Sequence, residues 1–94
     1  MENPYTEPFE IEITDTLDLH SFRPEEIRRA AEIFLEEARN KGFDRVRIIH
    51  GKGIGVQREI VRNLLSNLEF VESFKNGDEF SGGGSGATVV FFKA

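Results

Sequence analysis

The chain has 94 residues and no cysteine, which excludes a disulfide framework and a Cys-ligated zinc site. This length predicts one domain, and a hydrophobic fraction of 38% with nine Phe can fill one core. The sequence has neither an N-terminal basic region followed by an apolar run nor a membrane-length apolar stretch, so we expect a cytoplasmic protein without membrane contact.

Charge is unevenly distributed along the chain. The net charge is -5, but the segment from Arg39 to Arg62 holds seven basic residues against two acidic ones, a net charge of +5. We expect a local basic face on an acidic body. Such a basic face favours a nucleic-acid partner. A solvated helix surface is the alternative interpretation of the same charges.

Two short strands are predicted near the N-terminus. Phe9, Ile11 and Ile13 alternate with acidic residues, the period-two pattern of a half-buried strand at a sheet edge. The pattern resumes from Thr16 to His20, where leucines occupy one side and Asp18 and His20 share the other.

The rest of the chain alternates between helices and strands. A helix is predicted from Pro24, ending at Gly42, and a strand over residues 45–50. A second helix follows the glycines, from Val56 to near Asn67. Residues 70–74 and 87–92 predict two further strands around a loop over residues 75–86, with the last strand central in the sheet and covered on both faces. Phe74, Phe91 and Phe92 are expected in the core, and Phe80 in the loop.

The loop from His50 to Gly55 combines the features of an anion site. Glycines allow close approach of the backbone, the following helix offers unpaired amides, and Lys52 adds a positive charge. A tight turn without a ligand is the alternative. The spacing of Gly51, Gly53 and Gly55 matches neither a Walker loop nor a dinucleotide fingerprint.

Three titratable side chains are expected near this loop. Asp18 and His20 precede the first helix and His50 ends the next strand, so parallel pairing would bring them to one sheet edge, where we expect one cleft. Such a set offers a general acid, a general base and charge stabilisation for phosphodiester chemistry. Alternatively, Asp18 and His20 simply decorate an exposed strand face.

Three segments of the sequence resemble motifs of a known family. Leu17-Asp18-Leu19-His20 is similar to the LDLH motif of the Smr (small MutS-related) domain, and His50-Gly51-Lys52-Gly53 is similar to its HGxG motif. Residues 83–90 resemble the family's terminal glycine loop and last strand. The resemblance implies an α/β fold, a two-layer sandwich of βαβαββ type with a mixed sheet, here with an extra N-terminal extended segment. We therefore expect an extension over residues 1–16 and a standalone Smr domain over residues 17–94.

The resemblance also implies a function, a nicking or cleaving endonuclease acting on DNA or RNA. Asp18, His20 and His50 are then the predicted catalytic residues. The predicted substrate-binding residues are Gly51, Lys52, Gly53, Gly55, Arg47 and Arg58. The alternative is a non-catalytic nucleic-acid-binding module that uses the same cleft.

Some features of this function stay open at the level of sequence. Ser21 stands where the family usually has glycine after LDLH, and this departure bears on whether cleavage is retained. No metal ligand set is defined, and Mg²⁺ or Mn²⁺ are the candidate ions. Lys and Arg address phosphate without distinguishing DNA from RNA. We expect a monomer.

Overall fold

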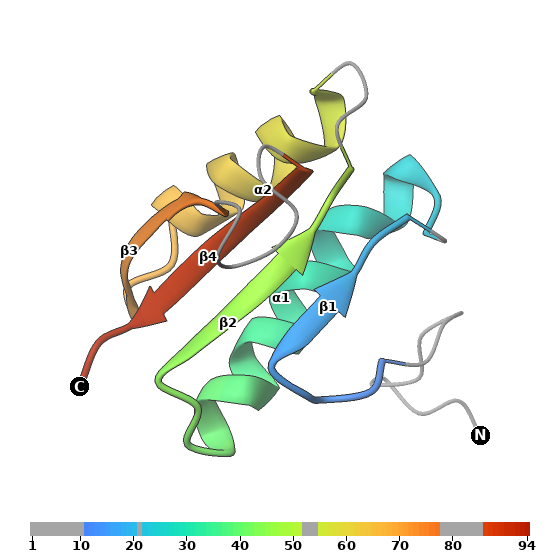
Figure 1. The fold of residues 1–94 in the computed structure, drawn as a ribbon. Helices are drawn as coiled ribbons and strands as arrows, with labels where there is room; N and C mark the ends of the chain where they lie inside the picture. The colour runs from blue at the N-terminus through green and yellow to red at the C-terminus, as the bar shows by residue number, and fades with distance from the viewer. Residues whose placement is uncertain (1–10, 21, 52–54, 78–85) are drawn as a thin grey trace.

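The computed structural model describes residues 11–20, 22–51, 55–77 and 86–94 (Figure 1). Within these residues the elements follow the order β1 (Thr16–Asp18), α1 (Pro24–Asn40), β2 (Arg45–Ile49), α2 (Val56–Ser66), β3 (Val71–Asn76) and β4 (Ala87–Phe92). Neither helix in these residues is long and apolar enough to span a membrane.

The four strands form one mixed sheet in the order β1-β2-β4-β3. β1 and β2 are parallel, whereas β4 is antiparallel to both β2 and β3. Both helices lie on the same face of this sheet, behind it in Figure 1. The predicted two-layer α/β sandwich of βαβαββ type is therefore confirmed.

The core lies between the sheet and the two helices. Buried residues recur along α1 at the spacing of one helical face, from Ile27 through Phe34 to Ala38. They meet the buried strand residues Leu17, Ile48 and Val90 and the leucines of α2. The face of the sheet turned away from the helices is the open face of this two-layer structure.

The ends of α1 follow from local chemistry. Pro24 occupies the first turn, where its missing N–H costs no hydrogen bond, and the Glu26 carboxylate accepts the backbone N–H of Arg23 at 3.0 Å. Gly42 lies beyond the end of the helix with φ of 93°, a conformation that favours glycine.

The strand predicted around Phe9 to Ile13 is wrong in its described part. Ile11 and Ile13 belong to no strand, although both are half-buried against the core, and Phe9 lies outside the described residues. Thr14 explains the difference, because its hydroxyl accepts the N–H of Thr16 and donates to the carbonyl of the same residue. Such a local turn competes with a strand ladder. The alternation of the two isoleucines reflects burial alone.

The last strand has the predicted central place, and every residue of it except Phe91 is buried, although the helices lie on only one of its faces. β4 lies between β2 and β3, while both helices cover only one of its faces. On the other face the ammonium of Lys75 lies 5.7 Å from the centre of the half-buried Phe91 ring. β3 also runs to Asn76, two residues into the predicted loop, and residues 78–85 of that loop lie outside the described residues.

Candidate active site at the sheet edge

The ends of β1 and β2 lie together at one edge of the sheet. The two strands are parallel, Asp18 pairs in register with Ile49, and the N–H of Leu19 donates to the Ile49 carbonyl at 2.8 Å. Backbone pairing thus brings Asp18, His20 and His50 to the same edge, where ligands of α/β sheets usually bind.

Asp18 and His20 form a close side-chain pair. Oδ1 of Asp18 accepts the backbone N–H of His20 at 3.0 Å and lies 2.6 Å from Nδ1 of its ring. The backbone hydrogen bond, followed by the bond from the imidazole, lowers the pKa of Asp18 below its usual value. The carboxylate is therefore ionised at neutral pH.

This pairing determines which nitrogen of His20 is available. An ionised carboxylate only accepts hydrogen bonds, so Nδ1 of His20 carries a proton. Its Nε2 has no hydrogen-bond partner among the described residues, and the side chain is 76% exposed. His20 can therefore exchange a proton with a bound molecule through Nε2.

His50 has a different environment. It is only 3% exposed, its Nδ1 lies 3.1 Å from the carbonyl oxygen of Gly51, and its Nε2 lies 2.9 Å from Oγ1 of Thr88. Burial lowers the pKa of His50, with smaller contributions from the positive charges of Arg58 and Arg62, while the hydrogen bond to Gly51 opposes the shift. A neutral ring fits these partners with Nδ1 donating to Gly51 and Nε2 accepting from the Thr88 hydroxyl.

The two histidines also lie on different sides of the sheet. Asp18 and Ile49 are register partners, so their side chains share the open face. His50 follows Ile49, and its ring contacts Thr88, which pairs with the core residue Ile48 on the helix side. The prediction of one shared cleft is therefore wrong: strand pairing brings Asp18, His20 and His50 to one sheet edge, but Asp18 and His50 lie on opposite faces of it.

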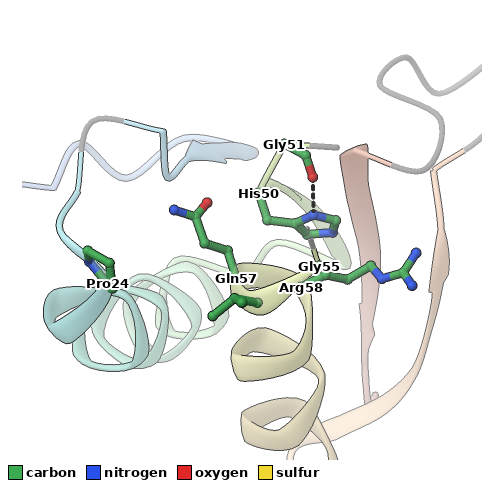
Figure 2. Close-up of a pocket in the computed structure, with 7 residues that line it drawn as sticks. Pro24, His50, Gly51, Gly55, Gln57 and Arg58 are labelled. Atoms are coloured by element: carbon green, nitrogen blue, oxygen red, sulfur yellow. Dashed lines mark hydrogen bonds between the residues drawn. The ribbon is translucent and has the colours of Figure 1, made fainter. Parts of the chain in front are cut away.

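A cavity of about 430 Å³ lies on the helix side of this edge (Figure 2). It is bordered by the first residues of both helices together with the end of β2. Its lining residues are Pro24, His50, Gly51, Gly55, Val56, Gln57 and Arg58. Neither Asp18 nor His20 is among them.

The N-terminus of α2 gives this cavity a positive character. Gly55 is the residue before the helix, with φ of 86°, and as a glycine it has no side chain to cap the amides of the first turn. Unpaired amides and the helix dipole favour an anion at this position. Arg58 adds a charge, and its buried Nε has no hydrogen-bond partner among the described residues.

The predicted binding residues are distributed over the molecule. Gly55 and Arg58 border the cavity, while Arg47 shares the open face with Asp18. The N–H of Gly51 is occupied, because it donates to the carbonyl of Gly86 at 2.9 Å. Lys52 and Gly53 lie outside the described residues.

Two further residues matter at this edge that sequence reasoning did not select. Thr88 is the hydroxyl partner of His50, and a single polar residue in the apolar run of β4 was the available signal. Phe91 was expected in the core and instead lies half-buried on the open face. In the part of the chain that the structure describes, no three His, Asp or Glu residues gather closely enough to hold a metal ion.

The fold and this edge define a small α/β domain with an exposed Asp–His pair on the open face and an electropositive helix N-terminus on the helix side. The family model of the Smr domain matches residues 17–93, and the chain belongs to the Smr domain family.

Relatives with related names match most of the chain. It is 46% identical over 77 residues to the putative endonuclease MutS2 of Bacillus subtilis, and 37% identical over 81 residues to the endonuclease MutS2 of Clostridium acetobutylicum. These matches cover 82% and 86% of this chain, which spans 10% of the length of each relative.

Solved structures of the family share the fold. The Smr domain of Thermus thermophilus MutS2 has a TM-score of 0.79 at 34% identity, with 86% of this chain and 100% of that chain covered. YdaL, a stand-alone small MutS-related protein from Escherichia coli, also has a TM-score of 0.79, at 29% identity over 85% of this chain and 65% of that chain.

Proposed function

We propose that this chain is an endonuclease that hydrolyses phosphodiester bonds of nucleic acid, with Asp18 and His20 as its catalytic residues. The observation that carries this proposal is the 2.6 Å contact between Asp18 Oδ1 and His20 Nδ1, which leaves Nε2 available at an exposed edge. The names of the MutS2 relatives, which describe endonucleases, support the same reaction.

In the proposed reaction His20 acts first as a general base. Nε2 accepts a proton from a water molecule as its oxygen forms a bond to phosphorus, and the bond from phosphorus to the ester oxygen breaks. The imidazolium can then return the proton to the departing oxygen. Asp18 fixes the ring orientation and stabilises the positive charge on it, as a carboxylate does beside a catalytic histidine.

The remaining predicted residues serve binding and positioning in this proposal. The first-turn amides of α2 and the Arg58 guanidinium would attract a phosphate at the edge. Lys52 and Gly53 remain part of the predicted phosphate loop. His50, whose two ring nitrogens already have protein partners, acts as a positioning residue that ties the end of β2 to β4.

The test is a cleavage assay on supercoiled DNA and end-labelled RNA, each with Mg²⁺, with Mn²⁺ and with a chelator. We expect cleavage by the wild type, reduced roughly 100-fold or more by Asp18→Asn and by His20→Ala, because general acid–base catalysis contributes at least that much. Affinity for uncut substrate should change little. Asp15→Asn is the matched control, since this exposed carboxylate contacts only the hydroxyl of Thr16 in the described residues.

Two results would contradict the assignment. Cleavage that survives both Asp18→Asn and His20→Ala would place the chemistry elsewhere. Binding without cleavage under all three metal conditions would replace the endonuclease with the non-catalytic nucleic-acid-binding module.

A further inference from the structure

The open face of the sheet presents an ordered set of side chains next to Asp18. Register places Thr16, Arg47, Val89 and Lys75 in one row across the four strands, in which Val89 is buried and Lys75 exposed. Arg45, Phe91 and Ser73 form the next row, farther from Asp18. Successive rows are separated by two residues, roughly 7 Å.

The charged residues that β2, β3 and β4 place on this face are of one sign, opposite to that of Asp18 on β1. Every charged residue at the paired positions of β2, β3 and β4 on the open face is basic, namely Arg45, Arg47 and Lys75. Arg45 and Lys75 are exposed, and Arg47 is half-buried. Because the chain as a whole carries a charge of -5, this concentration of positive charge is a local property of the sheet.

The ring of Phe91 lies in the middle of these basic residues. It pairs with Arg45 on one side and Ser73 on the other, and Lys75 Nζ lies 5.7 Å from its centre. A base stacked on an aromatic ring contributes more to binding than an exposed cation–π contact does. A nucleobase can therefore displace the ammonium, which is then free to pair with a phosphate.

We propose that the open face of the sheet binds single-stranded nucleic acid, with a base on Phe91, phosphates at Arg45 and Lys75, and the strand leading to the Asp18–His20 pair. This inference rests on the proposed function and deepens it by assigning the substrate class and its path. The strand would then approach Asp18 from the side opposite the cavity of Figure 2.

The chemistry of this face favours an unpaired strand over a duplex. Stacking on an aromatic side chain requires a base whose face is accessible, and the bases of a duplex are already stacked on one another. Arg and Lys around the ring address the backbone, so both RNA and DNA single strands fit.

The experiment measures binding separately from cleavage. Fluorescence anisotropy with a labelled 12-nucleotide RNA, the same sequence as single-stranded DNA and the matching duplex is recorded in chelator over a series of salt concentrations. The variants are Phe91→Leu, which keeps an apolar side chain without the aromatic face, and Arg45→Gln combined with Lys75→Gln. Arg28→Gln combined with Lys41→Gln is the matched control, because both residues are exposed and belong to α1 or its end.

We expect single strands to bind more tightly than the duplex. Phe91→Leu should weaken single-strand binding roughly tenfold. The Arg45/Lys75 variant should lower the slope of log affinity against log salt by about 1.4, or ~0.7 for each lost phosphate contact. The control pair should leave both quantities unchanged.

The outcomes separate this inference from the proposed function. The open-face proposal is overturned, even if the chain cleaves, by any of three results. These are an equal effect of the Arg45/Lys75 variant and the Arg28/Lys41 control, tighter binding of the duplex, or no binding of any of the three probes. If the open-face variants lose single-strand binding and the wild type cleaves no substrate, the binding surface is supported and the endonuclease proposal is rejected.

Discussion

At the scale of single residues, the protonation of His50 depends on folding. Its ring is buried between Gly51 and Thr88, and burial lowers its pKa below the ordinary value of 6.5. Protonation would also remove the Nε2 lone pair that accepts from Thr88. The folded protein therefore favours the neutral form of His50.

Stability should therefore fall as the solution becomes acidic. The unfolded chain takes up a proton on His50 near pH 6.5, whereas the folded chain does so only at lower pH, so the unfolded state binds more protons in between. We expect the free energy of unfolding to decrease from pH 7.5 to 5.5, by at most about 1.4 kcal/mol per pH unit from this residue. Urea unfolding at several pH values measures it.

Two controls isolate the contribution of His50. His50→Gln should flatten the pH dependence in this window, while His20→Gln should retain the part due to His50. The depressed pKa of Asp18 acts in the same direction but only below about pH 3.8, outside the window. An NMR titration in which the His50 ring protonates at or above pH 6.5 would reject the explanation.

At the scale of elements, the start of α2 depends on the conformation of Gly55. Its φ of 86° lies in the left-handed region, and a Cβ built there would meet no atom within 4 Å, so only the backbone resists substitution. Gly42 after α1 has φ of 93° and the same open surroundings. The two glycines form a matched pair that differs in proximity to the candidate phosphate site.

We expect Gly55→Ala and Gly42→Ala to lower the free energy of unfolding by similar amounts, about 1–2 kcal/mol each, because alanine is disfavoured in this region. Only Gly55→Ala should also weaken binding of inorganic phosphate or nucleic acid, since it changes the direction of the first amides of α2. Chemical denaturation and binding titrations measure the two effects. Equal losses of affinity in both variants would remove α2 from the phosphate site.

Elements with strong local signals could be predicted from the sequence. Pro24 and Gly42 bracket α1, and the glycines before Val56 precede α2, because capping and backbone freedom act within a few residues. The supposed strand at Ile11 and Ile13 failed because burial against a core produces the same alternation as a strand.

The candidate site was harder to predict, because part of it depends on contacts between segments that are far apart in the sequence. Asp18 and His20 are two residues apart, and strand geometry brings them close. The partner of His50 is Thr88, 38 residues later, and it arrives only through the pairing of β4 with β2. Phe91 lies on the open face because both helices cover the opposite face of the sheet. The side of the sheet on which the helices lie cannot be predicted from the sequence of β4 alone.

At the scale of the whole molecule, two isoleucines ahead of β1 pack against the core without belonging to a strand. Ile11 and Ile13 are half-buried against the core, and both precede the match to the Smr family model at residue 17. We propose that residues 11–15, the described part of the segment before β1, add stability and take no part in the reaction.

The double variant Ile11→Ser/Ile13→Ser tests this division. Each half-buried isoleucine should contribute about 1 kcal/mol, roughly half the value for a fully buried side chain, so unfolding free energy should fall by about 2 kcal/mol. Nucleic-acid binding by the folded protein should not change. Binding is measured without denaturant, at a temperature where circular dichroism shows that the variant is folded. Loss of binding under these conditions would make the extension part of the functional surface.

The position of β4 has a consequence for the order of folding. β4 is the last element along the chain, yet it separates β2 from β3 in the sheet. Until β4 is available, β2 has only the three-residue β1 as a strand partner, and β3 has none among the described strands. During synthesis the four-stranded sheet can therefore form only after β4 has been made. The hydrogen bond between His50 and the Thr88 hydroxyl forms in the same step.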